Sequence, residues 1–276
     1  VGSTAYVAAG NAGLRVVDVS DPTAPVEIGF YPTPGYAYDV AVAADYAYVA
    51  AGDAGLRVIN VRDPTAPAEV SFYDTPGVAQ GVMVTLDHAY VADGKTGLRV
   101  IDIRNPLSPM EVDAYDTSGN AWGVAVVGSM AYVADGDAGL RVVDVTTPTA
   151  LLEVGFYDTP GDARDVTVMG GIAYLADKGR GLRRVNVSNP MNPIEIDCYA
   201  IPEGGRDVAV AGNLVYLVGQ ERGLRVMDVS TPTIPVEIGS YTTPGNGQGI
   251  ALADSMAYIA DYGYGLRVVD VSDPTA

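Results

Sequence analysis

Three carboxylates recur at one position of a repeated pattern, and they are the residues best suited to hold a metal ion. Asp39, Asp165 and Asp207 occupy equivalent places in the pattern. Carboxylate oxygens are the ligands that Ca²⁺ prefers, and a Ca²⁺-dependent hydrolase is therefore one alternative. The equivalent residues of the other repeats are Gly81, Gly123 and Gly249, so the spacing alone does not bring the carboxylates together.

Other catalytic chemistry finds little support. His88 is the single histidine, and its place in a turn favours a solvated side chain over a metal ligand or a proton relay. The chain has neither a Gly-x-Ser-x-Gly nucleophile motif nor a glycine-rich phosphate loop before a helix. The segment 135–139 is similar to the start of a Ca²⁺ loop but lacks its length and its later glutamate. We therefore expect no enzyme activity and no cofactor, with Ca²⁺ as the alternative.

The position just before the carboxylates carries side chains that are typical of a binding surface. In chain order it reads Tyr38, Gln80, Trp122, Arg164, Arg206 and Gln248. Large aromatic and polar residues that vary against a constant frame indicate recognition, and the alternative is free drift at a solvated position. We predict ligand binding here, and the sequence does not identify the ligand.

A group of cations extends this hypothesis. Outside the arginine that every repeat carries, five of the nine remaining cations fall in one 45-residue window: Lys178, Arg180, Arg184, Arg206 and Arg222. Because the chain has a net charge of -18, such a group would attract a carboxylate, an acidic glycan or an acidic protein. Arg180 and Arg222 therefore join the predicted ligand-binding residues. Arg184 stands at an apolar strand position and needs an acidic partner or a ligand, and an ion pair between repeats is the alternative.

These residues are positioned by a repeat whose interval never changes. The segment Gly13–Val19 recurs six times, each copy beginning with Gly-Leu-Arg and lying 42 positions after the last. The copies begin at Gly55, Gly97, Gly139, Gly181, Gly223 and Gly265. A constant interval predicts stacked units, so we expect one domain over residues 1–276 that begins and ends in mid-repeat.

Four strands are predicted in the unit from Pro25 to Ala66. Their ranges are 26–31, 39–43, 46–50 and 56–61, separated by Pro- and Gly-containing turns. Four short strands in 42 residues predict an all-β fold, a β-propeller of four-stranded antiparallel blades. A β-solenoid is the alternative.

Seven blades fit the strand count better than six. We name the strands of a blade A to D, with residues 39–43 as an A strand and residues 26–31 as a D strand. The sequence then predicts six A, seven B, seven C and six D strands. Seven blades leave the first without its A strand and the last without its D strand, whereas six blades leave a B–C hairpin over. The incomplete blades expose a seam at which a partner or a second copy could pair.

The run Leu-Arg-Val-Val-Asp-Val, with Ala-Tyr-Val-Ala before it and Asp-Pro-x-x-Pro after it, resembles the LVIVD repeat family. The resemblance covers essentially the whole chain. It implies a propeller akin to the YVTN surface-layer type in a cell-surface or extracellular protein. It implies no particular reaction.

Residues that repeat position for position are predicted to be structural. One set is the arginine of each C strand, and a second is the Asp or Asn near the end of that strand. A third is the tyrosine that ends each D strand, which we expect to bury its ring and to bond through its hydroxyl. The tyrosines are Tyr31, Tyr73, Tyr115, Tyr157, Tyr199 and Tyr241.

Composition limits the partners. A chain that is 48% hydrophobic and 18% charged has enough apolar residues for a packed core, and it holds no apolar run long enough to cross a membrane. The net charge of -18 argues against nucleic acid. Cys198 is the single cysteine, which excludes an intrachain disulfide and leaves the compartment open.

The expected function is non-enzymatic recognition of a protein or a glycan, through the D–A and B–C loops around a channel mouth. The alternative is a structural module of a surface layer or repeat assembly, joined through the exposed seam strands.

Overall fold

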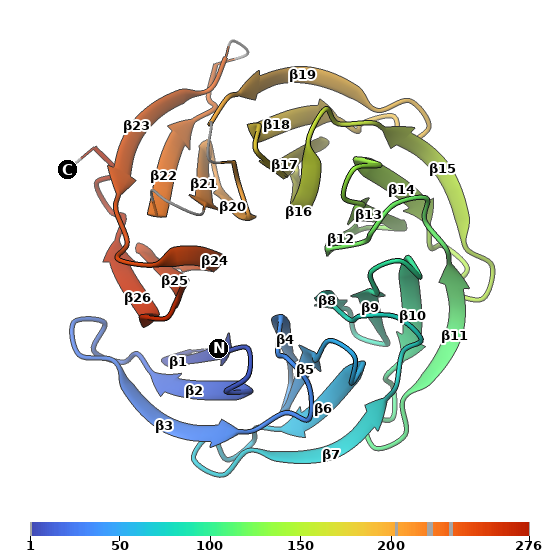
Figure 1. The fold of residues 1–276 in the computed structure, drawn as a ribbon, viewed down its shortest axis with the longest axis vertical. Helices are drawn as coiled ribbons and strands as arrows, with labels where there is room; N and C mark the ends of the chain where they lie inside the picture. The colour runs from blue at the N-terminus through green and yellow to red at the C-terminus, as the bar shows by residue number, and fades with distance from the viewer. Residues whose placement is uncertain (1, 202–203, 220–222, 232–233, 276) are drawn as a thin grey trace. The chain divides into compact units, whose positions relative to one another are not determined.

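The computed structural model describes residues 2–201, 204–219, 223–231 and 234–275. Within them the chain forms 26 β-strands and no helix, so nothing in that part could cross a membrane as an apolar helix. The strands make seven antiparallel sheets, the blades of a β-propeller (Figure 1). The prediction of an all-β propeller with seven blades is confirmed, and the six-blade alternative is wrong.

In each blade the strands lie in chain order, and the first and last blades have three strands instead of four. Blade 1 contains β1 (Thr4–Ala8), β2 (Leu14–Asp18) and β3 (Val26–Tyr31), and blade 2 contains β4 (Asp39–Ala43), β5 (Tyr46–Ala50), β6 (Leu56–Asn60) and β7 (Ala68–Tyr73). Blade 3 contains β8 (Gly81–Val84), β9 (His88–Ala92), β10 (Leu98–Asp102) and β11 (Met110–Tyr115). Blade 4 contains β12 (Gly123–Val127), β13 (Met130–Ala134), β14 (Leu140–Asp144) and β15 (Leu152–Tyr157).

Blade 5 contains β16 (Asp162–Met169), β17 (Ile172–Lys178), β18 (Gly181–Asn186) and β19 (Ile194–Tyr199). Blade 6 contains β20 (Asp207–Ala211), β21 (Leu214–Gly219), β22 (Gly223–Asp228) and β23 (Val236–Tyr241). Blade 7 contains β24 (Asn246–Ala253), β25 (Met256–Tyr262) and β26 (Gly265–Asp270). The strand boundaries predicted for the representative repeat are confirmed, except that its C strand ends one residue earlier, at Asn60.

The chain divides into two compact units. Unit 1 comprises residues 1–124 and 144–152, and unit 2 comprises residues 125–143 and 153–276. Blades 1 to 3 therefore belong to unit 1 and blades 5 to 7 to unit 2, with the boundary inside blade 4. The prediction of one domain over residues 1–276 stays a prediction.

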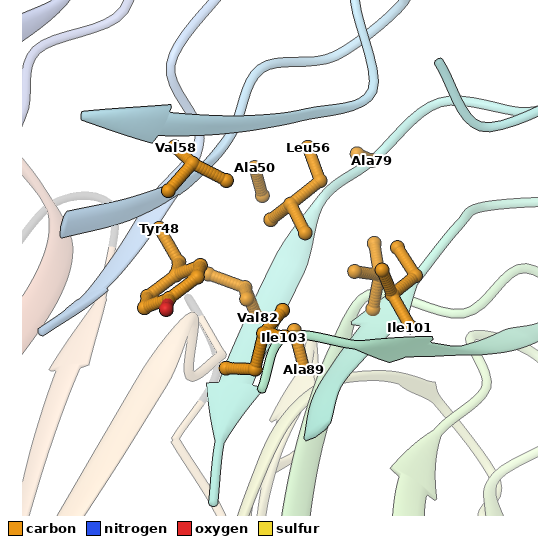
Figure 2. Packing of buried hydrophobic residues seen from close by; sticks show 10 residues of the cluster. Tyr48, Ala50, Leu56, Val58, Ala79, Val82, Ala89, Ile101 and Ile103 are labelled. Carbon is orange, nitrogen blue, oxygen red and sulfur yellow. The ribbon is translucent and has the colours of Figure 1, made fainter. Parts of the chain in front are cut away.

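Apolar side chains on both faces of a blade are buried against its neighbours in the same unit. Between blades 2 and 3 one buried cluster joins Leu56 and Val58 of β6 to Val82 of β8 and Ile101 of β10 (Figure 2). Burial of apolar surface contributes about 25 cal/mol per Å². The alternating alanines of the A and B strands fit this arrangement because two sheets approach closely there.

The arginine of each C strand pairs with an acid of its own blade, which confirms the structural prediction. Its guanidinium meets a carboxylate of the D strand, the D–A loop or the end of the B strand. The shortest pairs are Arg15–Glu27 at 3.1 Å, Arg57–Asp74 at 2.9 Å, Arg99–Asp116 and Arg141–Asp158 at 3.0 Å, Arg183–Glu195 at 3.2 Å, Arg225–Glu237, and Arg267–Asp261 at 3.6 Å.

The tyrosine at the end of a D strand links its blade to the next one. In unit 1 the Tyr31 hydroxyl donates to Glu69 of blade 2 at 3.3 Å, and Glu69 lies 3.7 Å from Arg57. In unit 2 the Tyr157 hydroxyl donates to Glu195 at 2.5 Å. Tyr199 repeats the contact with Glu237 at 3.1 Å. The prediction that these tyrosines bond through their hydroxyls is confirmed at these positions.

The Asp or Asn near the end of each C strand closes the turn that follows. Its side-chain oxygen accepts a hydrogen bond from the backbone amide two residues ahead, at 2.7 to 3.0 Å in all seven repeats. An Asx turn of this kind stabilises the backbone before the Pro-containing segment. These residues are therefore structural, as predicted.

Alkaline pH should weaken the contact that Tyr157 of blade 4 makes with blade 5. Burial first, and then the hydrogen bond to Glu195, raise the pKa of Tyr157 to about 12 from its ordinary value of 10.0. Because the folded pKa lies above the unfolded one, this contribution is complete below pH 10 and is lost as the pH rises through 12. We expect urea unfolding midpoints to fall over that range, and Tyr157→Phe to reduce the fall.

At pH 7 the same substitution should lower the free energy of unfolding by about 1 kcal/mol, because one hydrogen bond is lost. Tyr241→Phe is the matched control, since Tyr241 is the equivalent residue of blade 6 and is 43% exposed. An equal effect of both substitutions would show that the Tyr157 hydroxyl does not hold the blades together.

Candidate functional site

The predicted binding residues lie where the A strand of a blade begins. The backbone amides of Tyr38, Gln80 and Arg206 each donate to the last part of the B strand of the same blade, at 2.8 Å. Since strand direction alternates within a blade, this is also the end that carries the B–C turn. In each unit, therefore, the D–A and B–C loops share one edge of the blades, as predicted.

Two of the predicted residues occupy β-bulges. In blade 5 the pairing of β16 with β17 shifts register between Ala163 and Asp165, which leaves Arg164 as the extra residue. In blade 7 the shift between Gly247 and Gly249 leaves Gln248 in the same situation. A bulge re-aims its extra side chain out of the regular pleat. The side chains of Arg164 and Gln248 thus stand outside the regular pairing of their sheets.

In unit 1 aromatic side chains gather above the turn glycines. The rings of Tyr36 and Tyr38 lie 4.6 Å apart between centroids, and Tyr38 is 45% exposed. A Cβ at Gly10 would lie 2.7 Å from the Tyr36 ring, and a Cβ at Gly52 would lie 3.2 Å from the Tyr38 ring. Both glycines also have a positive φ. They therefore set the backbone and make room for the two rings.

Two amides meet above the next turn of unit 1. A Cβ at Gly94 would lie 3.4 Å from Nε2 of Gln80 and 3.5 Å from Oδ1 of Asn120. Gln80 is buried and also donates to the Ala121 carbonyl at 3.4 Å, whereas Trp122 is half-buried just before β12. Tyr38, Gln80 and Trp122 thus lie at the same edge of successive blades.

In unit 2 the predicted residues form polar contacts with one another and with neighbouring acids. Arg206 donates to Oε1 of Gln248 on the next blade. Arg164 donates to Asp162, two residues before it on β16. Arg180 is exposed in the turn between β17 and β18, and Arg222 lies outside the described residues. A single mouth formed by the residues of both units stays a prediction.

Blades 5 and 7 differ from the earlier blades in the B–C turn. In the first four repeats this turn begins with a glycine of positive φ: Gly10, Gly52, Gly94 and Gly136. Lys178 and Tyr262 occupy that place in blades 5 and 7, and the positive φ moves to Gly179 and Gly263. The amides of Arg180 and Tyr264 donate to the carbonyls of Asp177 and Asp261, so Gly179 and Gly263 are the second central residues of their turns. The B strand is therefore longer in these blades and carries Lys178 or Tyr262 at its tip.

The three carboxylates predicted as a Ca²⁺ alternative bond to backbone amides of the next blade. Asp39 accepts from Val82 N at 2.8 Å, Asp165 from Val208 N at 3.2 Å, and Asp207 from Ile250 N at 2.6 Å. Each acceptor oxygen thus holds two neighbouring A strands together. Among the described residues no group of three or more His, Cys, Asp or Glu side chains is placed to hold one metal ion.

Gly81 occupies the position that is Asp39 in the preceding repeat, and the A strand of the next blade comes closer to it. A Cβ at Gly81 would lie 2.5 Å from the Trp122 carbonyl oxygen and 3.1 Å from Cα of Gly123. No side chain fits in that space. Close approach of the next A strand therefore excludes an aspartate at position 81, whereas a Cβ at Gly249 would meet nothing nearer than Oδ2 of Asp207, at 3.4 Å.

A buried aspartate at the end of the B strand fixes the D–A loop in several blades. Asp93 accepts from the Thr75 hydroxyl at 2.5 Å and from the Gly77 amide at 2.8 Å. In blade 5 burial raises the pKa of the equivalent Asp177, which the Arg183 guanidinium opposes. Asp135, which opens the segment similar to a Ca²⁺ loop, lies 3.7 Å from Arg141 in the same arrangement. This carboxylate is part of the frame beneath the loops.

Arg184 finds the acidic partner that its apolar position required. Its Nη2 lies 3.0 Å from Asp197, directly across the strand pair of blade 5, and both side chains are buried. Its Nη1 donates to the Val229 carbonyl of blade 6 at 3.3 Å. The ion pair lies within one blade instead of between repeats, and Arg184 is not part of a surface patch. Burial of this pair also raises the pKa of Asp197.

A small groove of about 280 Å³ lies on the outer strand of blade 1, away from the predicted residues. Glu27 to Phe30 of β3 and the turn 65–67 of blade 2 line it. A Cβ at Gly29 would lie 2.2 Å from the Pro64 carbonyl oxygen, so the groove marks a close contact between blades.

Sequence reasoning missed five residues of the same edge. Tyr36, Asn120 and Asn246 lie two positions before a predicted residue, and Tyr262 and Tyr264 lie in the B–C turn of blade 7. Their positions also vary between repeats, with Gly or Ala in the B–C turns of blades 2 and 4. Comparison of every loop position, instead of one position per loop, could have identified them.

Removal of the Asp207 carboxylate should destabilise unit 2, because it holds two A strands together. Asp207→Ala leaves the amides of Val208 and Ile250 without this acceptor, which costs about 1–3 kcal/mol. Asp137→Ala, at an exposed turn position of the same unit, should change the free energy of unfolding by less than about 0.5 kcal/mol. Equal urea midpoints for the two variants would contradict the view that the Asp207 carboxylate holds two adjacent A strands together.

Comparisons with solved structures agree with the fold. A protein from Desulfotomaculum acetoxidans DSM 771, described as functionally unknown, matches with a TM-score of 0.78 and 14% identity over 94% of this chain and 89% of that one. A chain of the mitotic checkpoint complex matches with a TM-score of 0.82 and 9% identity over 98% and 87%. The computationally designed Ika8 protein matches with a TM-score of 0.67 and 10% identity over 97% and 80%. At these identities the likeness shows the propeller fold alone.

No curated protein matches the chain significantly. The family model of the LVIVD repeat matches residues 2–33, 34–75, 76–117, 118–159, 160–200, 204–243 and 244–276. These segments cover nearly the whole sequence and follow the repeat interval seen in the blades. The chain therefore belongs to the LVIVD repeat family.

Proposed function

We propose that this protein is a non-enzymatic recognition propeller of the cell surface or the extracellular space. It binds a protein or a glycan through the D–A and B–C loops. The observation that carries the proposal is the placement of the variable residues. Arg164 and Gln248 stand on bulges outside the regular strand pairing, and Tyr38 is 45% exposed at the start of its strand.

The contrast with the repeated residues supports this function. The arginines, the Asx-turn residues and the tyrosines Tyr31, Tyr157 and Tyr199 are engaged in contacts within or between blades. The large side chains of Tyr38 and Tyr262 are instead 45% and 63% exposed at the loop edge. Exposed aromatic residues beside amides and cations are typical of interaction surfaces. Extracellular placement follows from the family resemblance and is part of the proposal.

Site-specific photocross-linking tests which edge of the blades meets the partner. In one variant a benzophenone amino acid replaces Tyr38, which is 45% exposed. In a second variant it replaces Leu86, which lies in the A–B turn of blade 3 and is 93% exposed. We expect an adduct with a component of the cell-surface extract from position 38 and none from position 86. Adducts from position 86 alone would place the partner on the wrong edge.

The double substitution Asn120→Ala and Trp122→Ala, in the same unit as Tyr38, should abolish the adduct formed from position 38. A matched control replaces Arg104 and Leu107, which lie in the C–D turn of blade 3 and are well exposed. The control should keep the adduct. Equal adduct yields in both variants would contradict recognition by the loop edge.

Assembly through open strands is the second candidate function. In blade 7 no D strand of the described residues pairs with β26, and its residues are more exposed than those of the equivalent β22. A row of free backbone donors and acceptors favours pairing with another strand. A repeat assembly or a surface layer would use this edge.

Light scattering over a range of protein concentrations tests the assembly. We expect a concentration-dependent rise in mass that Val268→Pro suppresses, because proline removes a backbone donor from the open edge of β26 or bends the strand. Leu107→Pro, in a turn, is the control. A constant monomer mass at high concentration would dispose of this candidate.

The Ca²⁺-dependent hydrolase is tested separately by calorimetry. Ca²⁺ binding by the unmodified protein that disappears in Asp165→Ala would support it, and the absence of heat in both proteins would end it. We expect no heat, since the Asp165 carboxylate already accepts a backbone amide.

A further inference from the structure

The outer edge of blade 7 is open. No strand of the described residues pairs with β26 on the side away from β25. Val268 and Val269 of this strand are half-buried, whereas Val16 and Val17, at the same places of β2 in blade 1, are buried. The edge therefore presents apolar surface and a row of backbone groups that a further strand would cover.

The amino-acid sequence of this edge also occurs in blade 1, where the partner strand is present. Residues 265–276 repeat residues 13–24 without a single change. In blade 1 the strand β2 pairs antiparallel with β3, whose sequence is Val-Glu-Ile-Gly-Phe-Tyr. Register in a sheet follows from the side-chain pattern of the two strands. The strand β3 is therefore a template for the strand that fits β26.

The turn after β26 has the same conformation as the turn that leads into β3. The side chains of Asp270 and Asp273 accept hydrogen bonds from the amides two residues ahead, at 2.9 and 3.0 Å. The equivalent bonds of blade 1 have the same lengths. The Pro274 carbonyl lies so close to Gly239 of blade 6 that no side chain fits there. The turn is thus held against blade 6 and leaves the edge of β26 uncovered.

Each D strand that the structure describes carries a glutamate that meets the C-strand arginine of its own blade. The nitrogen–oxygen distances are 3.1 Å in blade 1, 3.2 Å in blade 5 and 3.7 to 3.9 Å in blades 2 to 4, and the pair recurs in blade 6. In blades 2, 5 and 6 the tyrosine that ends the preceding D strand donates to the same glutamate. A guanidinium and a hydroxyl therefore define the place of this carboxylate.

Blade 7 supplies the arginine of this arrangement. Arg267 already has two contacts, because its Nε lies 3.6 Å from Asp261 and its Cζ lies 5.9 Å from the centroid of the Tyr264 ring. Arg141 combines the same two kinds of contact with a glutamate of its D strand, 3.9 Å from Nη1. The equivalent distance at Arg183 is 3.2 Å. The contacts of Arg267 are thus compatible with a further acid.

Blade 6 supplies the tyrosine. Tyr241 ends β23 and is 43% exposed, whereas the equivalent Tyr199 donates to Glu237 of the next blade at 3.1 Å. Within the described part of the chain, blade 7 has no D-strand glutamate that Tyr241 could reach. A glutamate on an added strand would meet the Tyr241 hydroxyl and the Arg267 guanidinium together. Hydrogen bonds that involve an ionised group are about twice as strong as neutral ones.

We propose that the open edge of blade 7, formed by β26, Arg267 and Tyr241, binds a strand of another polypeptide with the pattern apolar–Glu–apolar–Gly–aromatic–Tyr. The strand adds antiparallel to β26, and its glutamate meets Arg267 and Tyr241. Each D strand that the structure describes is paired within its own blade, so none of them is the donor. The inference rests on the second candidate function, assembly through open strands, and names the partner strand that this edge recruits.

Fluorescence anisotropy with a labelled peptide of residues 24–33, which contains β3, tests the proposal. We expect saturable binding, and binding about tenfold weaker for the Glu27→Gln peptide, because the charged contact becomes a neutral one. The Ile28→Pro peptide should not bind, since proline interrupts the pairing of a strand. Absence of binding by the unmodified peptide would overturn the proposal.

Variants of the protein test the place of the glutamate. Arg267→Gln should weaken the unmodified peptide about tenfold and leave the Glu27→Gln peptide unaffected, because the two substitutions remove the same contact. Tyr241→Phe, which removes only a hydroxyl, should weaken the unmodified peptide about fivefold. Arg104→Gln, exposed in blade 3, is the control and should bind as the unmodified protein does.

Circular dichroism melts of the three variants confirm that they are folded. Equal weakening of the two peptides by Arg267→Gln, together with full binding by Tyr241→Phe, would show that the glutamate lies elsewhere and overturn the assignment.

A benzophenone amino acid in place of Phe30 of the peptide locates the bound strand. In blade 1 Phe30 lies opposite Arg15, so the peptide should label β26 at or next to Arg267. Mass spectrometry of the digested adduct identifies the labelled segment. Labelling of any other strand would overturn the proposal.

Failure of this inference can be told from failure of the assembly itself. If the mass in light scattering rises with concentration and Val268→Pro suppresses the rise, but the peptide does not bind, assembly stands and the partner strand assigned to the edge is wrong. If the peptide labels β26 while the protein stays monomeric, the edge recruits a strand of this pattern from a different polypeptide, and only self-assembly is overturned.

Discussion

Every other feature of this protein depends on the burial of both faces of each four-stranded sheet. One repeat cannot achieve this, because a short sheet with apolar side chains on two faces exposes them unless sheets lie on either side. Leu56 and Val58 of blade 2 need Val82 and Ile101 of blade 3, and the relation recurs between blades 5 and 6. The constant length of the repeat follows from this requirement, since an insertion within a strand would disturb two interfaces.

Polar contacts determine how adjacent blades are registered. Near the A strands, carboxylates such as that of Asp207 bond the amides of the next strand. Near the D strands, the hydroxyls of Tyr157 and Tyr199 each donate to a glutamate of the following blade. That glutamate also forms an ion pair with the C-strand arginine of its own blade. Both contacts lie outside the apolar interface, and both are directional. Burial brings the sheets together, and these hydrogen bonds define one alignment among the many that apolar packing would tolerate.

Because the packed sheets hold the backbone in place, the side chains at the loop edge can vary between repeats. Arg164 and Gln248 stand on bulges whose backbone is fixed by the flanking ladder, so their side chains can change without loss of packing. In blades 5 and 7 the glycine of the B–C turn stands one position later in the chain than in the first four blades. The B strand is longer there, and Lys178 and Tyr262 lie at the tips of the hairpins. Small local changes can thus alter the surface chemistry while the propeller stays the same.

The sequence by itself determined the fold class, the blade count and the structural role of the repeated residues, because a strict period of 42 residues reports packing that every unit shares. It also located the variable position before each A strand. The partners of single residues were decided only in three dimensions. The Asp39 carboxylate accepts a hydrogen bond from Val82 N of the next blade, and Arg184 needed an acid that proved to be Asp197, 13 positions away on the next strand. Tyr262 and Tyr264, in the B–C turn of blade 7, were overlooked for the same reason. Periodicity describes what the repeats have in common, whereas a site is made by side chains from different repeats that meet only after the sheets have packed.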